Sequence, residues 1–167
     1  AAGLTNVELQ IGDMTALEPG EPYAAVQCTL GIFFVDDMPA LVRTFLRLVR
    51  ANGGQVAVTG FGERFFDPMR DVFVAAVAEV RPGFKVVEPW RRTESADVLR
   101  ALLHESGADE VSIETEDDEL PLPSPDAWWR IVMGSGLRHT ITAIGDDAAA
   151  EVRRRCDAYV EEHGIRS

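Results

Sequence analysis

The alternation of apolar and polar residues predicts four strands along the chain. Val7–Ile11 alternates regularly, which is typical of a strand with one buried face. Residues 23–34 are mostly apolar and include Val, Ile and Phe, so they predict a buried strand that runs into a loop. Gln55–Thr59 and Val111–Thr115 carry the same kind of strand pattern.

Five helices are expected where apolar residues recur at helical spacing. The first has Asp36 or Asp37 as its N-cap and Pro39 in its first turn, and it stops at the glycine pair 53–54. The other four begin near Asp67-Pro68, Ser95, Ser124-Pro125 and Asp146, and stop signals follow three of them at Pro82-Gly83, Gly107 and Gly164. This alternation of strands and helices predicts an α/β fold with a largely parallel sheet, which we expect to form a single domain over residues 1–167.

Composition narrows the class of protein. With 167 residues, 46% hydrophobic and 26% charged, the chain resembles an ordinary soluble globular domain. The net charge of −12 argues against nucleic acid as a partner, because phosphate binding needs clustered Lys and Arg. No apolar run approaches the ~20 residues of a membrane span, and the start shows no signal-peptide pattern, so we expect no membrane partner and a cytoplasmic location.

The titratable residues give no catalytic pattern by spacing alone. The two cysteines lack CxxC partners, and Cys28 lies in an apolar run, which favours a buried small hydrophobe over a reactive thiol. The three histidines are scattered, and the acidic residues between positions 109 and 119 are typical of a solvated segment, so no metal site is expected.

Three stretches together resemble class I S-adenosylmethionine-dependent methyltransferases of the ubiquinone/menaquinone-biosynthesis type. Residues 6–17 resemble the third strand of that family and the adenine-contacting turn after it. Residues 29–37 resemble the end of the fourth strand and its loop. Residues 46–58 resemble the following helix, turn and fifth strand, with Ala51-Asn52 where the family usually has Arg-Pro. Residues 96–107 and 128–137 add weaker likenesses to a late helix and a substrate-side insertion.

The resemblance implies an S-adenosylmethionine cofactor at the carboxyl ends of these strands. Asp13 would accept a hydrogen bond from the adenine amino group, and Met14 would contact the ring. Cys28, Thr29 and Leu30 would line the cofactor. Methyl transfer from a sulfonium is an in-line displacement that depends chiefly on alignment, so no catalytic residue is nominated.

The acceptor implied by the resemblance is a small molecule, and three side chains are candidates for its pocket. They are Phe34, Trp128 and His139. His139 could act as a general base or could be a surface or structural histidine. Trp128 and Trp129 point about 100° apart on a helix, so one is expected to face the core and the other a pocket or interface.

The family's glycine-rich loop and its first two strands have no counterpart before Asp13, and its last strand has none near the C-terminus. Since the chain starts at Ala1 and its first methionine is Met14, we expect a processed or truncated product. The sheet would be an incomplete Rossmann-like methyltransferase sheet with vacant places between its strands. Because unpaired buried backbone groups are costly, we expect another chain or a second copy to complete it, or the strands to rearrange or swap.

Two functions therefore remain open. The first is methyl transfer to a small-molecule acceptor, with the isolated chain expected to be inactive. The second is a non-catalytic α/β module for association or scaffolding that has lost cofactor binding. A fragment held as an oligomer by its unpaired strands is a third reading.

Overall fold

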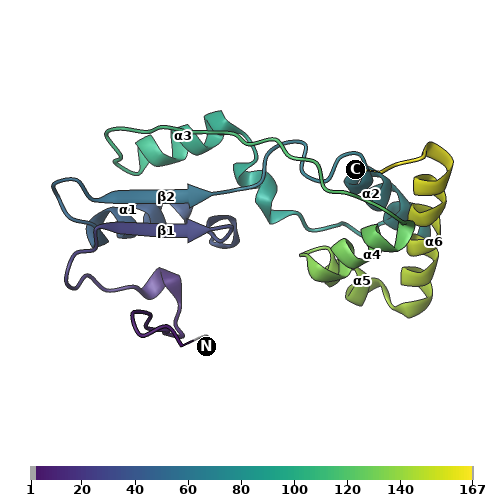
Figure 1. The fold of residues 1–167 in the computed structure, drawn as a ribbon, viewed down its shortest axis with the longest axis horizontal. Helices are drawn as coiled ribbons and strands as arrows, with labels where there is room; N and C mark the ends of the chain where they lie inside the picture. The colour runs from purple at the N-terminus through teal and green to yellow at the C-terminus, as the bar shows by residue number, and fades with distance from the viewer. Residues whose placement is uncertain (1–2, 167) are drawn as a thin grey trace. The chain divides into compact units, whose positions relative to one another are not determined.

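The computed structural model describes residues 3–166, and Figure 1 shows its mixed helices and strands. In chain order the elements are η1 (Met14–Ala16), β1 (Ala25–Thr29), η2 (Ile32–Phe34), α1 (Met38–Leu48), β2 (Gln55–Thr59), α2 (Met69–Val80), η3 (Pro89–Thr93), α3 (Ala96–Glu105), α4 (Pro125–Gly134), α5 (Arg138–Ile144) and α6 (Asp146–His163), where η denotes a 3₁₀-helix. The expected mixed α/β class is confirmed. Its sheet is small, because it contains only β1 and β2 among the described residues.

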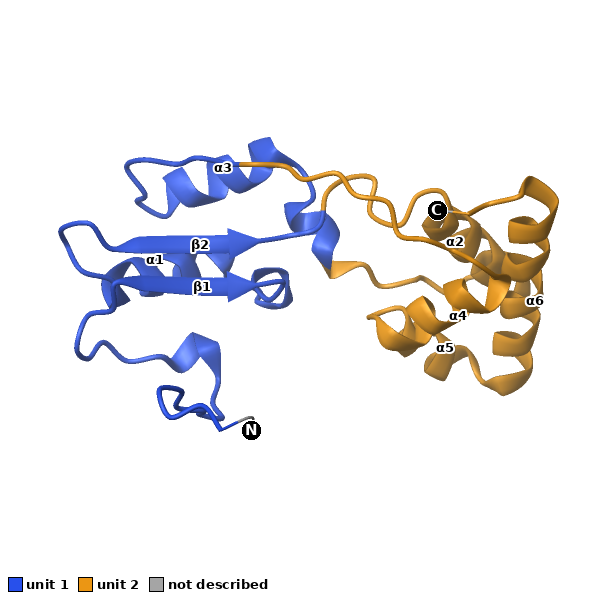
Figure 2. Ribbon diagram, viewed as in Figure 1, with its two compact units in different colours: residues 1–61, 90–113 blue, residues 62–89, 114–167 orange. Residues whose placement is uncertain are grey.

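The chain forms two compact units, which Figure 2 colours separately. We call residues 1–61 and 90–113 the sheet unit, and residues 62–89 and 114–167 the helical unit. Each has its own buried apolar side chains, and each is described by itself below. The expectation of a single domain over the whole chain stays a prediction.

The sheet unit is built on a β1–α1–β2 segment. The two strands pair in parallel, with Val26 opposite Val56 and Cys28 opposite Val58. These four residues are buried or half-buried, whereas their neighbours along each strand are exposed. Because side chains alternate across a strand, the sheet has one apolar face and one open polar face. Helix α1 lies against the sheet in Figure 1 and contacts β2.

Helix α1 begins where capping chemistry predicts it, but it ends at Leu48, before the predicted stop at Gly53-Gly54. The Asp37 side chain accepts a hydrogen bond from the Ala40 backbone N–H at 2.9 Å, and Pro39 lies in the first turn. Leu41, Phe45 and other apolar residues at helical spacing are buried along one side of the helix. This amphipathic pattern supplies the apolar surface that the sheet unit needs for a core.

Two of the four expected strands do not form. Val7–Ile11 and Val111–Thr115 have no strand neighbour among the described residues, and neither is assigned as a strand. Leu9 is 84% exposed and Ile11 is fully exposed, so the alternating pattern covers no apolar surface. A strand needs a partner for its backbone groups, which explains why alternation alone was insufficient.

The helical unit is organised around α6, which packs against α2, α4 and α5. Its core contains Phe73 and Val77 from α2, Trp128 and Val132 from α4, and Val152 from α6, all less than 2% exposed. The predicted helices at Ser95, Ser124-Pro125 and Asp146 are confirmed as α3, α4 and α6, and the one after Asp67-Pro68 is α2. Helix α5 was not predicted, because its seven residues carry few start or stop signals.

No helix within residues 3–166 is both long and apolar enough to cross a bilayer.

Candidate functional site

The carboxyl end of β1 makes a sharp change of direction at Leu30. This residue has φ +52°, a left-handed conformation that costs a branched L-residue roughly 1–2 kcal/mol. Its backbone N–H lies 3.2 Å from both the carbonyl and the hydroxyl oxygen of Thr59 at the end of β2. Strained residues of this kind concentrate at binding and catalytic sites, so this junction is the first candidate.

Gly31 follows directly and lies where two other candidate side chains meet. A Cβ at Gly31 would come within 3.3 Å of the Cys28 sulfur and 3.9 Å of the Met14 methyl carbon. Met14 belongs to η1, so the turn after residues 7–11 reaches the end of β1. Met14 and Cys28 thus lie near the same point of the backbone, directly after Leu30, and their role in holding a cofactor stays a prediction.

The Cys28 thiol is buried at this junction, which favours a packing role over a nucleophilic one. Burial raises the pKa of Cys28, and the backbone N–H groups of Gly31 and Ile32, which donate to the sulfur, oppose that effect only in part. The side chain is 7% exposed. A neutral, buried thiol contributes soft apolar surface, which agrees with the expectation that Cys28 behaves as a small hydrophobe.

Asp13 caps η1 beside this junction. Its Oδ1 atom accepts hydrogen bonds from the Thr15 backbone N–H at 2.8 Å and from the Thr15 hydroxyl at 2.7 Å. These bonds lower the pKa of Asp13, the backbone bond having the larger effect. The residue is exposed and ionised at neutral pH, and a carboxylate has further lone pairs with which to accept a donor from a ligand.

An aromatic cluster lines the carboxyl end of β2. The Phe61 ring lies 6.1 Å from the Phe33 ring and 6.4 Å from the Trp90 ring, the second in an edge-to-face arrangement. The Phe33 ring is 4.8 Å from that of Phe34. Phe33 and Trp90 are buried, whereas Phe34 is 66% exposed, so Phe34 presents an aromatic surface next to the junction.

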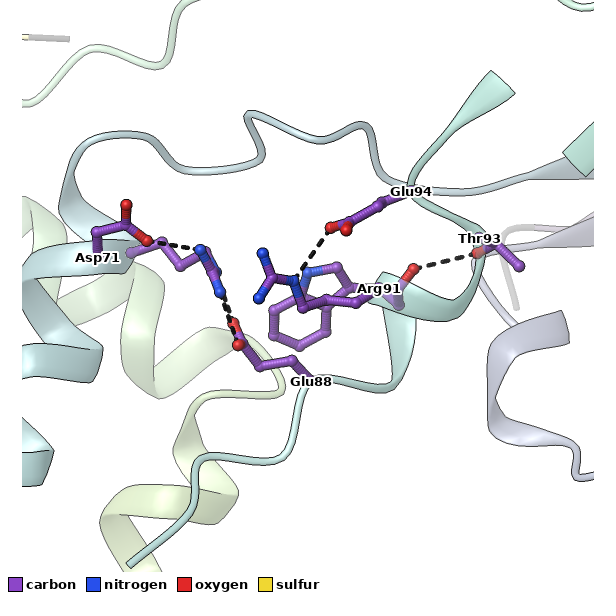
Figure 3. A network of polar contacts seen from close by, with 7 residues as sticks. Asp71, Glu88, Arg91, Thr93 and Glu94 are labelled. Atoms are coloured by element: carbon purple, nitrogen blue, oxygen red, sulfur yellow. Dashed lines mark hydrogen bonds and ion pairs between the residues drawn. The ribbon is translucent and has the colours of Figure 1, made fainter. Parts of the chain in front are cut away.

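The segment η3 holds this cluster in place. The Thr93 hydroxyl donates to the Trp90 carbonyl at 3.2 Å, a bond drawn in Figure 3, and Thr93 is fully buried. A Cβ at Gly60 would lie 3.3 Å from the Thr93 hydroxyl, so glycine permits the close approach of η3 to the end of β2. Sequence reasoning missed Phe61, Trp90 and Thr93, because no spacing pattern links positions this far apart.

The remaining pocket candidates lie in the helical unit. Trp128 is 1% exposed and packs in that unit's core, with its ring 5.7 Å from the Phe66 ring. Trp129 is half-buried and lies under the Arg153 guanidinium, 5.5 Å from its ring centre. Trp128 is thus the core residue of the tryptophan pair, and a pocket or interface at Trp129 stays a prediction. His139 is exposed on α5.

A hollow of about 440 Å³ lies in the helical unit at the start of α6. Arg81, Asp146 and Asp147 line it together with apolar groups. The two carboxylates already complement the positive end of the helix, so the hollow does not favour an anion. Within residues 3–166, no group of three or more His, Cys, Asp or Glu side chains is placed to hold a metal ion.

Comparison of the chain with protein-family models, with curated proteins and with solved structures found no match.

Proposed function

We propose that the chain is the central and C-terminal part of a class I S-adenosylmethionine-dependent methyltransferase acting on a small-molecule acceptor. One observation carries the proposal: Met14 and Cys28 meet at Gly31, at the carboxyl end of a parallel strand. Ligands of open α/β sheets bind at that edge. The resemblance to the family implies that Met14 contacts the adenine ring and that Cys28 lines the cofactor.

The residues present fit the adenine end of the cofactor. The half-buried Met14 offers soft apolar surface for a ring, the buried Cys28 thiol packs beside Gly31, and glycine at position 31 leaves open the space that a Cβ would occupy. Asp13 offers a carboxylate lone pair for the adenine amino group, and Thr29 and Leu30 complete the rim. The residues named at this junction are assigned to the adenine end, and we propose that another chain supplies the half of the site that holds the amino-acid end.

When bound, the cofactor supplies an electrophilic methyl group on a sulfonium sulfur. The part played by this chain is to hold the adenine end and to shape the surface on which the acceptor lies. The exposed Phe34 ring, next to the junction, is suited to stack on a planar acceptor. In-line displacements are accelerated chiefly by such alignment.

Completion of the sheet is part of the proposal. In the described chain, β1 and β2 each pair along one edge only, because the sheet has two strands. Open edges invite pairing with further strands. We propose that strands of a partner chain or of a second copy occupy these edges, and that Val7–Ile11 becomes a strand in that assembly.

The test is an NMR titration of the ¹⁵N-labelled chain with S-adenosylhomocysteine. Because only the adenine end is held, we expect weak binding, with Kd on the order of 1 mM, and shifts confined to the amides around Asp13, Met14, Leu30 and Gly31. Gly31→Val should weaken binding at least tenfold, because its side chain would crowd the Cys28 sulfur. Gly20→Val is the matched control, since nothing lies within 4 Å of a Cβ there. Absence of shifts at these amides at saturating ligand would overturn the proposal.

The second candidate is a non-catalytic association module, and a separate observation favours it. Of the twelve exposed large hydrophobic residues among those described, eight lie between residues 4 and 34. A contiguous apolar patch marks an interaction surface, and on this reading these residues form one. On this reading the chain self-associates or binds a partner through that stretch and gives no ligand-dependent shifts at Gly31.

A further inference from the structure

The loop that follows β1 is fastened by one guanidinium group. Nη1 of Arg92 donates to the Phe33 carbonyl at 3.2 Å and to the Val35 carbonyl at 2.7 Å, and Nη2 donates to the Asp36 carbonyl at 2.9 Å. Arg92 is more than fifty residues away along the chain, on η3. Three carbonyls within four residues thus converge on a single side chain.

These carbonyls belong to a segment with little regular structure of its own. The Phe34 and Val35 amides donate to the Gly31 and Ile32 carbonyls at 3.2 Å, which closes the single turn of η2. A single 3₁₀ turn is weak by itself. The planar fork of arginine can bind several acceptors at fixed angles, so Arg92 fixes the path of the backbone here.

The backbone that carries the Arg92 side chain is itself held in place by buried neighbours. In η3, Trp90 lies two positions before Arg92 and Thr93 follows it directly, and both Trp90 and Thr93 are buried against residues at the end of β2. The guanidinium therefore joins the carboxyl end of β2 to the loop after β1, within the sheet unit. The segment it fixes begins at Gly31, which abuts Met14 and Cys28.

We propose that Arg92 is a positioning residue for the site at the end of β1, holding residues 31–36 in the conformation that receives the ligand. The effect of Arg92 on binding of S-adenosylhomocysteine rests on the proposed function. The effect of Arg92 on the conformation of the loop rests on the structure alone. Arg92 touches no reacting group. It acts through the backbone of the loop, and its removal should release the loop without unfolding the unit.

Hydrogen exchange tests the loop directly. In Arg92→Gln the Phe34 and Val35 amides should exchange about tenfold faster or more, as expected for loss of hydrogen bonds to a charged donor. Arg92→Lys keeps the charge but replaces the planar guanidinium by a single ammonium group. The Phe34 and Val35 amides should therefore exchange faster in this variant too. Arg100→Gln is the matched control, because it removes the same charge from an exposed pair with Asp97 on α3. Slowly exchanging α1 amides should stay unchanged in all three variants.

The same variants are titrated with S-adenosylhomocysteine. The expected result is Kd raised severalfold or more by both Arg92 variants and unchanged by Arg100→Gln. Unchanged exchange at Phe34 and Val35 in Arg92→Gln would overturn the inference, as would equal acceleration of the α1 amides, which would mean a general loss of stability. Faster loop exchange with unaltered affinity would overturn the link to the site. If the unsubstituted chain gives no ligand shifts while loop exchange responds as stated, the proposed function fails and the positioning of the loop by Arg92 stands.

Discussion

The Arg70 guanidinium and the Glu88 carboxylate form a two-pronged ion pair in the helical unit, with Nε–Oε1 at 2.6 Å and Nη2–Oε2 at 2.7 Å. Nη1 of Arg70 donates in addition to Asp71 at 2.6 Å. Figure 3 shows Glu88 and Asp71 with these bonds. Both side chains of the main pair are only 10% exposed. The hydrogen bonding of Arg70 to the Glu88 carboxylate is the largest of the effects that raise the pKa of Arg70, so the guanidinium stays charged.

Glu88→Gln should lower the free energy of unfolding of the helical unit by about 3 kcal/mol, because it leaves a buried guanidinium without its main counter-charge. Urea unfolding followed by indole fluorescence measures this, since Trp128 and Trp129 lie in that unit. Asp97→Asn is the control: it breaks an exposed pair and should cost under about 1 kcal/mol. Equal effects of the two substitutions would contradict the importance given to the buried pair.

Cys156 should make the helical unit less stable at high pH. Burial raises the pKa of its thiol to about 11, from 9.0, and the nearby Trp128 indole opposes this only in part. The unfolded chain loses the thiol proton first, so stability is complete below pH 9 and falls as pH rises through the folded pKa. The total loss is roughly 2–3 kcal/mol.

Urea unfolding at a series of pH values checks this expectation. The measurement compares Cys28→Ala with the double variant Cys28→Ala/Cys156→Ala, so that only one thiol differs. Below pH 9 the double variant should have the lower free energy of unfolding, because a small cavity replaces the sulfur. Between pH 9 and 11 its free energy of unfolding should change less. Parallel pH profiles would show that Cys156 does not cause the slope.

Gly54→Ala should destabilise the sheet unit by about 2–3 kcal/mol, because the new methyl group has no room. A Cβ there would lie 2.5 Å from the Arg50 carbonyl oxygen and 2.6 Å from the Arg50 nitrogen, and these are backbone atoms that cannot move aside cheaply. Thermal unfolding monitored by circular dichroism measures the effect. Gly20→Ala, with no atom within 4 Å, should leave the melting temperature nearly unchanged. A Gly54→Ala variant as stable as Gly20→Ala would show that the turn after α1 opens easily.

Leu9→Asp should leave the stability of the monomer within about 0.5 kcal/mol, because Leu9 is 84% exposed. If Val7–Ile11 pairs in an assembly as proposed, the same change should raise the dissociation constant of self-association at least tenfold. Sedimentation velocity over a concentration series measures it. Val98→Asp places the same charge on an exposed position of α3 and controls for a general effect of charge. A chain that is monomeric at all concentrations, with or without the substitution, would remove the second copy from the proposal.

Local signals in the sequence determined most helix boundaries. Asp37 and Ser95 cap α1 and α3 through their own side chains, and Gly164 ends α6 in a left-handed conformation. Capping bonds and stop signals act within about one helical turn, so neighbouring residues are sufficient to specify them. The strand predicted at Gln55–Thr59 forms because β1 lies beside it and pairs with its backbone.

Tertiary structure decided the rest, because it depends on contacts between distant segments. Val7–Ile11 has the right alternation but no neighbouring strand to satisfy its backbone, and Val111–Thr115 lacks one as well. The assignment of Met14 and Cys28 to one cofactor site came only from a family resemblance and stays a prediction. The reach of Arg92 to the loop after β1 had no signal at all, since hydrogen bonds to backbone carbonyls do not depend on which side chains the loop carries. The sequence thus determined where helices start and stop, and only the folded chain determined which of its segments lie at the end of β1.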